Sequence, residues 1–368
     1  MTAARPRLHR RAHSPTRHLA LAIAGLGLQG MALAADEPVF QFTVSPRDTL
    51  IGLSQTTFVS RQAWREVARL NRLPDPNRIT PGQVLRVPVR LMRSTPVAAR
   101  ITSVVGEVKV GDTSVQAGAE LTQGQSLQTG DGGSAVLELA DGSRVRVTPS
   151  SLAELQASQQ VGASPATNGG FAGLMRLVRG SVEVLASKVR RAKPLEVTTP
   201  TAVVGVRGTH YRVNLDGEAG PGTRSEVLEG LVRLDPADGR AGTDLRAGFG
   251  AAVADAGAAP TAVALQTAPD LSALPDLFER PLVRFPLAAE TATVRVQVAQ
   301  DAEFDRVVSD QRVPAGTEVR IAGLDDARWY LRARRLDGQG TEGFDSVRPF
   351  VLKARPEPPA SSSPRANG

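Results

Sequence analysis

The feature that most constrains the fold is a run of short alternating segments over residues 100–253. Apolar and polar residues alternate there in stretches such as ITSVVGEVKV, SAVLELADGSRVRV and SEVLEGLVRLD. Asp141-Gly142 separates two such stretches, which is a strong hairpin signal. A Gly-x-Val-x-Val/Leu pattern recurs at Gly106, Gly180 and Gly230, each time where a strand opens. Helix signals are scarce, so this region predicts a mainly β domain of stacked coils or a rolled sheet.

The N-terminus has the pattern of a secretory signal peptide. A basic lead, MTAARPRLHRRAHSPTRH, precedes the uncharged run LALAIAGLGLQGMALA, and Ala32-Leu33-Ala34 has the spacing that a signal peptidase accepts. We expect a signal peptide at 1–35, cleaved after Ala34 or Ala35, and a periplasmic or cell-envelope location. The alternative is that the segment is not cleaved and serves as a membrane anchor, because its apolar run is almost long enough to span a bilayer. No later segment is long and apolar enough to span a bilayer.

Loss of the leader changes how the charge is interpreted. The whole chain has 44 basic and 37 acidic residues, and five of the arginines lie in the leader. The remainder carries 39 basic against 37 acidic residues, a net charge of +2. This balance gives no support to nucleic acid as a partner.

The composition also excludes several kinds of chemistry. The absence of cysteine excludes disulfides, thiolate zinc sites and cysteine nucleophiles. Three of the four histidines lie in the leader, and His210 alone cannot form a His-rich metal site. No spacing singles out a carboxylate pair of the kind that hydrolyses glycosides. We therefore expect no enzyme activity, no catalytic or metal-binding residue, and no cofactor.

The segment after the leader predicts a compact strand–helix–helix–strand unit. FQFTV alternates as a strand, and Asp48 or Thr49 is suited to cap a helix that begins with LIGLSQ. In SRQAWREVARLN, apolar residues recur at helical spacing behind Ser60 as a cap, and Asn71 ends the helix. We expect Trp64 in the core rather than in a sugar-stacking role. QVLRVPV then returns as a second strand.

This order, with FTVSPRDTL and NRLPDPNRITPGQVLRVP, resembles the LysM domain, a small glycan-binding module, over residues 38–92. The family implies that N-acetylglucosamine-containing chains, here peptidoglycan, lie between the first strand–helix loop and the loop before the last strand. Backbone N–H groups at a helix start suit acetamide carbonyls, and small apolar side chains suit the ring faces. The resemblance assigns glycan contact to Arg47, Asp48, Thr49, Leu50, Leu73, Pro74, Asn77 and Ile79. The family usually has Gly where Arg47 stands, so this side chain either crowds the groove or contacts an anionic glycan.

Over residues 100–253 the chain resembles the FecR domain. The resemblance rests on GEVKV, GQSLQTGDGGSAVLELADGSRVRVTPSS, LVRGSVEV, VTTPTAVVGVRGTHYRV and EVLEGLVRL, in that order. It implies an all-β roll or solenoid-like stack outside the cytoplasmic membrane. In the best-known members a membrane helix joins this part to a cytoplasmic segment that controls a sigma factor. No such span follows here, so the resemblance implies the β fold without that regulatory arrangement.

Within this region, VVGVRGTHYRV combines an apolar run with a Gly-x-Arg-Gly-Thr turn. One hypothesis pairs Arg207 with His210 for anion binding or acid–base chemistry. The hypothesis that we favour is that the stretch closes a sheet, because such an arginine more often satisfies backbone acceptors. We then expect buried valines, and glycines at a kink or a positive φ: Val203, Val204, Val206, Gly205 and Gly208.

The C-terminal part contains a linker, a further β region and a tail. Residues 254–279 are rich in Ala and Pro, which predicts a linker. Residues 280–354 alternate on a spacing that suits a β-sandwich, and RWYLRARRLDGQGTEGFDS resembles the late strands of fibronectin type III modules. One of the adjacent residues Trp329 and Tyr330 should face the core and the other outward. The tail at 355–368 should be unstructured.

Together these patterns predict an exported multidomain protein with a small βααβ LysM-like unit, a mainly β FecR-like roll and a C-terminal β-sandwich. We expect it to bind peptidoglycan and to present residues 100–353 as a protein-interaction scaffold whose linker lets the two β units reorient. The protein partner would be an envelope protein or a second copy. Two alternatives remain: an envelope signalling protein of the FecR type, and a peptidoglycan-modifying enzyme targeted by LysM.

Overall fold

The computed structural model describes residues 39–162, 170–189, 192–206, 208–216, 222–254, 259–287 and 290–355. The predicted signal peptide, Arg207 and the predicted tail beyond Arg355 lie outside the described residues. The chain divides into two units, and all the described residues belong to the unit that begins at Pro38. Among them, no helix is long and apolar enough to cross a membrane.

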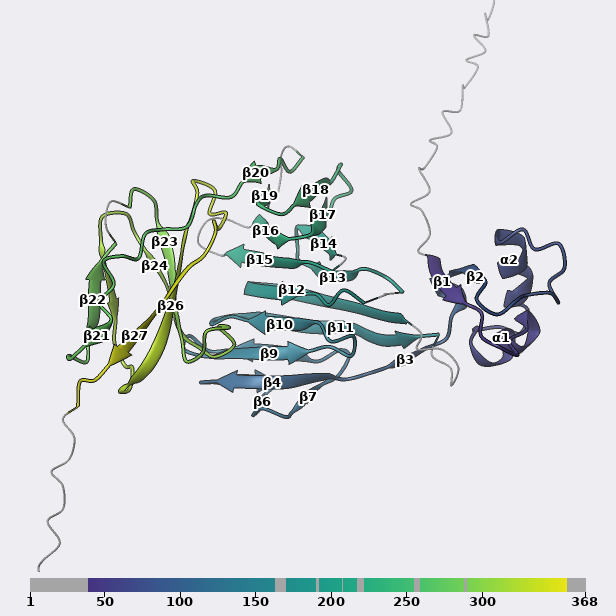
Figure 1. Ribbon diagram of the computed structural model, residues 1–368, viewed down its shortest axis with the longest axis horizontal. Coiled ribbons are helices and arrows are strands. Elements are labelled where there is room, and N and C mark those ends of the chain that lie inside the picture. Colours follow the sequence, from purple (N-terminus) through teal and green to yellow (C-terminus); the bar gives the residue numbers. More distant parts are fainter. Residues whose placement is uncertain are drawn as a thin grey trace, which may run out of the picture. The chain divides into compact units, whose positions relative to one another are not determined.

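The first described region, residues 39–92, is a small unit with the predicted strand–helix–helix–strand order (Figure 1). Its elements are β1 (Val39–Thr43), α1 (Leu50–Thr56), α2 (Ala63–Leu70), β2 (Val84–Pro88) and the short 3-10 helix η1 (Val89–Leu91). The strands pair antiparallel, with Thr43 opposite Val84. Of the two predicted caps of α1, Thr49 is the one that acts, because its Oγ1 accepts a hydrogen bond from the Gly52 N–H group at 3.0 Å.

The two ends of α2 differ in how well the sequence predicts them. Ser60 is not the cap of α2: its Oγ accepts a hydrogen bond from the Gln62 N–H group at 3.1 Å, in a turn before the helix, and Gln62 takes the N-cap position. Asn71 ends the helix as predicted. Its Nδ2 donates to the carbonyl oxygens of Val67 at 2.7 Å and Arg86 at 2.8 Å, and its Oδ1 accepts from the Arg86 N–H group at 2.7 Å. This one side chain ties the end of α2 to β2.

A small apolar core holds this unit together. Trp64 is half-buried and packs against that core, as predicted. The most deeply buried members come from both strands, both helices and the turn between the helices: Phe42, Leu50, Phe58, Val67, Leu85 and Val87.

The central region consists of two sheets that share one apolar core and one long strand, β12. The first, the β11 sheet, runs in the order β6-β5-β8-β11-β12-β13-β14-β17-β18, with β3 also paired to β11. Its strands are β3 (Ser94–Pro96), β5 (Val108–Val110), β6 (Thr113–Ser114), β8 (Ser126–Thr129), β11 (Leu152–Val161), β12 (Gly170–Leu185), β13 (Leu195–Thr198), β14 (Ala202–Val206), β17 (Leu231–Pro236) and β18 (Thr243–Arg246).

The second, the β15 sheet, runs in the order β7-β4-β9-β10-β12-β15-β16-β19-β20. Its other strands are β4 (Ala99–Val105), β7 (Glu120–Leu121), β9 (Ser134–Glu138), β10 (Arg144–Val147), β15 (His210–Asp216), β16 (Gly222–Glu229), β19 (Phe249–Ala254) and β20 (Val263–Ala264). The prediction of a mainly β architecture after a small mixed unit is therefore confirmed.

The recurrent glycines mark places where the chain passes from one sheet to the other. Gly106, Gly180 and Gly230 have φ values of 61°, 79° and 84°, in the left-handed region that favours glycine. Gly106 and Gly230 lie just before strands, as predicted. Gly180 instead lies inside β12, where this strand leaves the β11 sheet and joins the β15 sheet.

The stretch VVGVRGTHYRV forms part of the roll. Val204 and Val206 are buried, but Val203 is only half-buried, because alternate residues of β14 point to opposite faces. Gly208 has a φ of 64°, as predicted. Gly205 lies within β14, which pairs on both sides, and it does not have a positive φ, so the predicted kink at that position is wrong.

The C-terminal region is β-rich, as predicted. Trp329 lies in its core, and the neighbouring Tyr330 is half-buried on the opposite face, which confirms the expected alternation. The closer resemblance to fibronectin type III stays a prediction. A five-stranded sheet runs in the order β21-β27-β26-β23-β24, and β22 pairs with β25. The strands are β21 (Leu277–Phe278), β22 (Val283–Pro286), β23 (Val294–Ala299), β24 (Val307–Val313), β25 (Glu318–Ile321), β26 (Ala327–Arg335) and β27 (Ser346–Leu352).

The segment predicted as a linker, 254–279, makes close contacts over its described part. Leu271 and Leu274 belong to the core of the C-terminal region. Arg335 Nη1 donates to the carbonyl oxygens of Thr267 at 2.7 Å and Ala268 at 3.0 Å. These contacts fix the second half of the segment against the strands that follow it.

Candidate functional site

The two loops that the LysM resemblance assigns to glycan leave from the same end of the β1–β2 pair. The strands are antiparallel and Thr43 lies opposite Val84, so the loop after β1 and the loop before β2 share that end. Val44 extends the pairing: its N–H group donates to the Gln83 carbonyl at 2.9 Å, and its carbonyl accepts from the Gly82 N–H group at 2.8 Å. The fold thus supplies the juxtaposition that a groove between these loops requires.

In the first loop, three of the four predicted residues remain accessible. Arg47 is exposed, and its φ of 74° lies in the left-handed region, which gives a physical reason for the glycine that the family usually has there. Asp48 Oδ2 accepts a hydrogen bond from the Ser45 N–H group at 2.8 Å, and Thr49 caps α1. Leu50 is 0% exposed, so its side chain belongs to the core.

The second loop presents an exposed amide between apolar side chains. Leu73 and Ile79 are half-buried and pack against the core of the unit. Pro74 and Asn77 are exposed. Asp75 shapes the loop, because its Oδ1 accepts a hydrogen bond from the Asn77 N–H group at 2.8 Å. An amide flanked by partly exposed apolar groups suits a ligand that carries both acetamides and ring faces.

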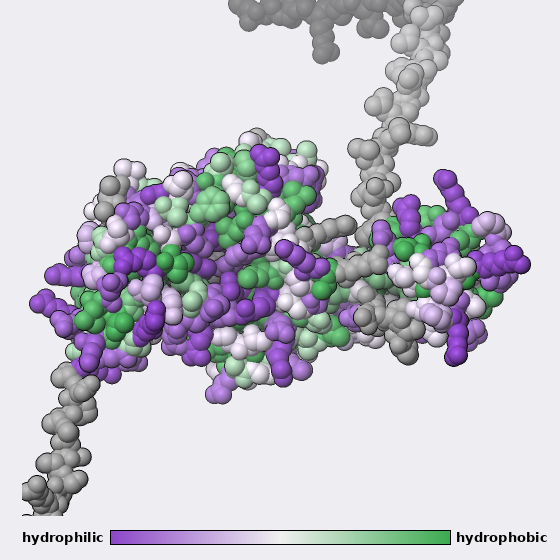
Figure 2. All heavy atoms as spheres, in the orientation of Figure 1, coloured by the Kyte–Doolittle hydropathy of each residue, from purple (hydrophilic) through white to green (hydrophobic). Residues whose placement is uncertain are grey.

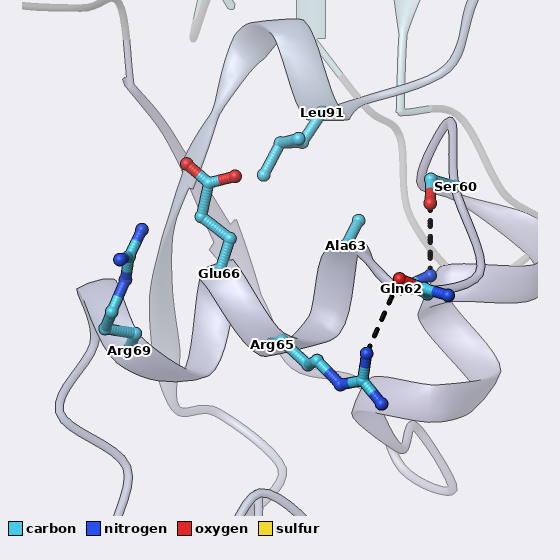
Figure 3. Close-up of a pocket in the computed structure, with 7 residues that line it drawn as sticks. All are labelled: Ser60, Gln62, Ala63, Arg65, Glu66, Arg69 and Leu91. Atoms are coloured by element: carbon cyan, nitrogen blue, oxygen red, sulfur yellow. Dashed lines mark hydrogen bonds between the residues drawn. The ribbon is translucent and has the colours of Figure 1, made fainter.

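A separate hollow of about 440 Å³ lies beside α2 (Figure 3). It contains none of the eight predicted glycan residues, and the sequence reasoning did not identify it. Gln62 links two other residues that line the hollow. Its N–H group donates to Ser60 Oγ, and its Oε1 accepts from Arg65 Nη1 at 3.4 Å. The lining residues are Ser60, Gln62, Ala63, Arg65, Glu66, Arg69 and Leu91.

A second cluster of charged side chains lies on the outer face of the β15 sheet. Four residues, alternately basic and acidic, stand opposite one another on four adjacent strands: Arg146 on β10, Glu183 on β12, Arg212 on β15 and Glu226 on β16. Their neighbours along each strand belong to the apolar core on the other face. All four are nevertheless buried, at 8% exposure or less. Buried charges require partners, and here the partners come from another sheet.

The facing groups belong to the C-terminal region. Arg332 Nη2 donates to Glu183 Oε2 at 3.0 Å, and Arg212 Nη2 donates to Asp345 Oδ2 at 2.8 Å. These buried ion pairs do not fit the prediction that the linker lets the FecR-like unit and the C-terminal unit reorient. We call this cluster the ionic layer; its members are Arg146, Glu183, Arg212, Asn214, Glu226, Arg295, Gln297, Asp305, Asp310, Arg332, Arg334, Glu342 and Asp345.

His210 lies at the margin of the ionic layer. Its Nε2 is 2.7 Å from Glu183 Oε1, and its side chain is 26% exposed. Arg146 Nη1 reaches the same carboxylate oxygen at 3.2 Å. Burial alone would raise the pKa of Glu183, but the charge of Arg332 and the hydrogen bond from His210, with the other arginines, lower that pKa well below its usual value. This position favours a structural role for His210.

Glu226 and Glu342 form the other end of the ionic layer. Glu226 Oε1 accepts from the Glu342 N–H group at 3.1 Å, and its Oε2 accepts from Asn214 Nδ2 at 2.8 Å. Burial, followed by the negative charge of Glu342, raises the pKa of Glu226 to about 8. Burial also opposes ionisation of Glu342, but Arg295 and Arg334 outweigh it and lower its pKa.

The region of the two predicted glycan loops and the central β region each match a known protein family. The LysM domain matches residues 42–88, and the FecR protein family matches residues 125–233. This chain contains a LysM domain followed by a FecR domain. Both families are non-catalytic binding or regulatory domains. Among the curated proteins, none matches the chain.

Several solved structures resemble parts of the chain distantly. A proposed anti-sigma factor from Parabacteroides distasonis is 18% identical, with a TM-score of 0.30, over 38% of this chain and 59% of that one. The extracellular domain of a proposed one-component system from B. thetaiotaomicron is 8% identical, with a TM-score of 0.17, over 62% of this chain and 35% of that one. This chain therefore spans less than two thirds of either structure.

Sequence reasoning identified the loops of the LysM domain but missed the ionic layer between the FecR domain and the C-terminal region. A signal was present: Arg146, Glu183 and Arg212 each stand between two apolar residues of an alternating strand, in SRVRV, GSVEVL and THYRV. Such residues normally point to solvent in a half-buried sheet. Only the register between the strands shows that their charges alternate across the sheet.

Proposed function

We propose that this is an exported, non-enzymatic cell-envelope protein that binds peptidoglycan through its LysM domain and presents its FecR domain as a scaffold. The observation that carries the proposal is the pair of LysM loops at one end of the β1–β2 pair. A LysM domain implies glycan binding, and such domains belong to extracellular or envelope proteins. The predicted signal peptide at 1–35 would deliver the chain to the periplasm.

Within the groove, we assign contact with N-acetylglucosamine residues to the accessible side chains of both loops. Asn77 would bond acetamide groups, and the exposed parts of Leu73, Pro74 and Ile79 would cover the ring faces. Asp48 and Thr49 are occupied in part by backbone contacts and would act at the rim. Leu50 would contribute through its backbone only, since its side chain is buried.

The test is co-sedimentation of the chain from residue 36 onward with purified sacculi, together with titration by soluble chito-oligosaccharides. Asn77→Ala should weaken both interactions several-fold, because it removes the exposed amide. Gln55→Ala, which changes an exposed amide on α1, is the matched control and should bind as the native chain does. Retention no greater than that of an unrelated protein would refute the proposal.

For the scaffold role, the ionic layer determines which surfaces are free. The C-terminal region already covers the charged outer face of the β15 sheet, so a partner would use the β11 sheet or strand edges. Exposed Leu231, on β17 of the β11 sheet, is a suitable position for a photocrosslinking residue. A specific crosslink in intact cells would support the scaffold role, and recovery of only uncrosslinked monomer would oppose it.

A further inference from the structure

The positive charge of this chain is concentrated in the LysM domain. Residues 39–93 contain nine arginines and no lysine against three acids, a net charge of +6. Residues 94–368 contain 30 basic against 32 acidic residues, a net charge of −2. A neutral N-acetylglucosamine chain gives no reason for such an excess of arginine. A negatively charged ligand would account for it.

The structure leaves these arginines at the surface. All nine are exposed, and hydrophilic side chains project around α1 and α2 on the face that Figure 2 shows. Glu66 pairs with Arg90, and Asp75 lies 3.7 Å from Arg78. Among the described residues, Arg61, Arg69 and Arg72 make no ion pair. The acids of the domain are thus too few to neutralise its arginines.

Four of the arginines lie on α2 or directly beside it: Arg61, Arg65, Arg69 and Arg72. Arg65 and Arg69 are four residues apart within the helix, which places them on one side of it, whereas Arg61 precedes the helix and Arg72 follows it. We call them the basic stripe. Arg65 and Arg69 line the hollow beside α2, and Figure 3 shows both side chains coming from that helix. Arg65 makes only one long hydrogen bond there, at 3.4 Å to Gln62, and its guanidinium lies 5.4 Å from the centre of the Trp64 ring.

The stripe is continuous in the chain with the predicted groove. α2 ends at Leu70, and Arg72, with a φ of 51°, turns the chain directly into the loop that begins at Leu73. Arg47 and Arg78 belong to the two groove loops themselves. A ligand held between the loops would therefore have cations beside it and further cations along α2.

We propose that the basic stripe and the hollow beside it bind the carboxylates of peptide stems that branch from the glycan strand. This inference rests on the proposed function, because the stems reach the stripe only if the strand lies between the loops. Carboxylates match guanidinium groups in charge and in hydrogen-bonding geometry. Each exposed pair contributes little by itself, so the stripe acts through several weak, salt-sensitive contacts.

The experiment compares three ligands and three proteins, all used as the chain from residue 36 onward. The ligands are phosphate-free sacculi, the same sacculi with carboxyl groups converted to neutral amides, and neutral chito-oligosaccharides. The proteins are the native chain, R65Q/R69Q, and R100Q/R284Q, which loses the same charge at exposed positions outside the LysM domain. Circular dichroism and thermal melting establish that the variants are folded.

We expect R65Q/R69Q to bind untreated sacculi about threefold to tenfold more weakly, and the native chain to lose a similar factor on amidated sacculi or in high salt. Chito-oligosaccharide binding should be unchanged in R65Q/R69Q, and R100Q/R284Q should behave as the native chain. Equal binding of untreated and amidated sacculi would overturn the inference while leaving glycan binding intact. If the native chain did not bind chito-oligosaccharides at all, the result would instead count against the proposed glycan-binding groove.

Discussion

Arg332 of β26 donates a hydrogen bond to Glu183 of β12 at 3.0 Å, although the two residues are 149 positions apart in the chain. Their side chains are 5% and 3% exposed. The same carboxylate also takes contacts from Arg146 and His210, so one buried anion gathers three basic groups. Such a pair fixes how the FecR domain meets the C-terminal region more than it raises stability, because burial of both charges is itself costly.

Removal of the carboxylate charge should therefore be severe. Glu183→Gln leaves buried guanidinium groups without their anion, and we expect it to lower the free energy of unfolding by about 3–5 kcal/mol. Urea denaturation of the chain from residue 36 measures this. The control Glu120→Gln, at an exposed position of β7, should change stability by less than about 0.5 kcal/mol. If Glu183→Gln were as mild as the control, the ionic layer would not form in solution.

The ionic layer also predicts an unusual dependence of stability on pH. Glu226 has an ordinary pKa of 4.5 that rises to about 8 in the folded chain. Between those values the folded chain binds more protons than the unfolded chain, so this group makes stability fall as pH rises through the window. Glu183, Asp310 and Asp345 have lowered pKa values, so the stability that they contribute is lost as pH falls below their ordinary range.

Glu226→Gln isolates the first effect, because glutamine imitates the protonated acid. Relative to the native chain, the variant should gain at least about 1 kcal/mol in free energy of unfolding between pH 5 and pH 8. Urea midpoints at pH 5, 6, 7 and 8 measure the gain, with Glu120→Gln as the control. A difference that stays constant across the series would show that Glu226 ionises normally.

The parts of the fold that sequence predicts are those whose signals are local. Thr49 caps α1 through Gly52, and Asn71 ends α2 in part through Val67, so both act on neighbours a few residues away. Gly106 and Gly230 mark turns by their own backbone freedom. The ionic layer depends instead on which strands become neighbours. Arg212 meets Asp345 only after β15 and the C-terminal sheet are in place, so no short window of sequence contains the contact.

The candidate glycan site shows the same division. The order of loops was available from the LysM resemblance, but the burial of Leu50 depends on how α1 packs against the rest of the core. The basic stripe could have been counted from the sequence. The hollow beside Arg65 and Arg69 could not, because Leu91 reaches it from η1.

Arg47 provides a test of strain at the groove. A side chain at a φ of 74° costs about 1–2 kcal/mol, whereas glycine adopts this conformation freely but loses more entropy on folding. Arg47→Gly should therefore raise the free energy of unfolding by a net of about 0.5–1 kcal/mol, and Arg47→Ala should not. Chemical denaturation compares the two variants, which lose the same charge. Equal stabilities would mean that the loop relaxes out of the left-handed region.

Gly180 and Gly142 form a matched pair that separates backbone strain from a steric clash. Both have a φ of 79°, but a Cβ at Gly142 would meet no atom within 4 Å, whereas at Gly180 it would lie 2.2 Å from Ser151 Oγ and 2.7 Å from Ser151 Cα. Gly142→Ala should lower the free energy of unfolding by about 1–2 kcal/mol through strain alone. Gly180→Ala carries the same strain and must also displace the backbone where β12 crosses between the sheets, so we expect a further loss of at least about 2 kcal/mol. Thermal and urea unfolding of the two variants measure the difference. Equal losses of stability would show that the backbone at Ser151 shifts to accommodate the added Cβ without a further loss of free energy.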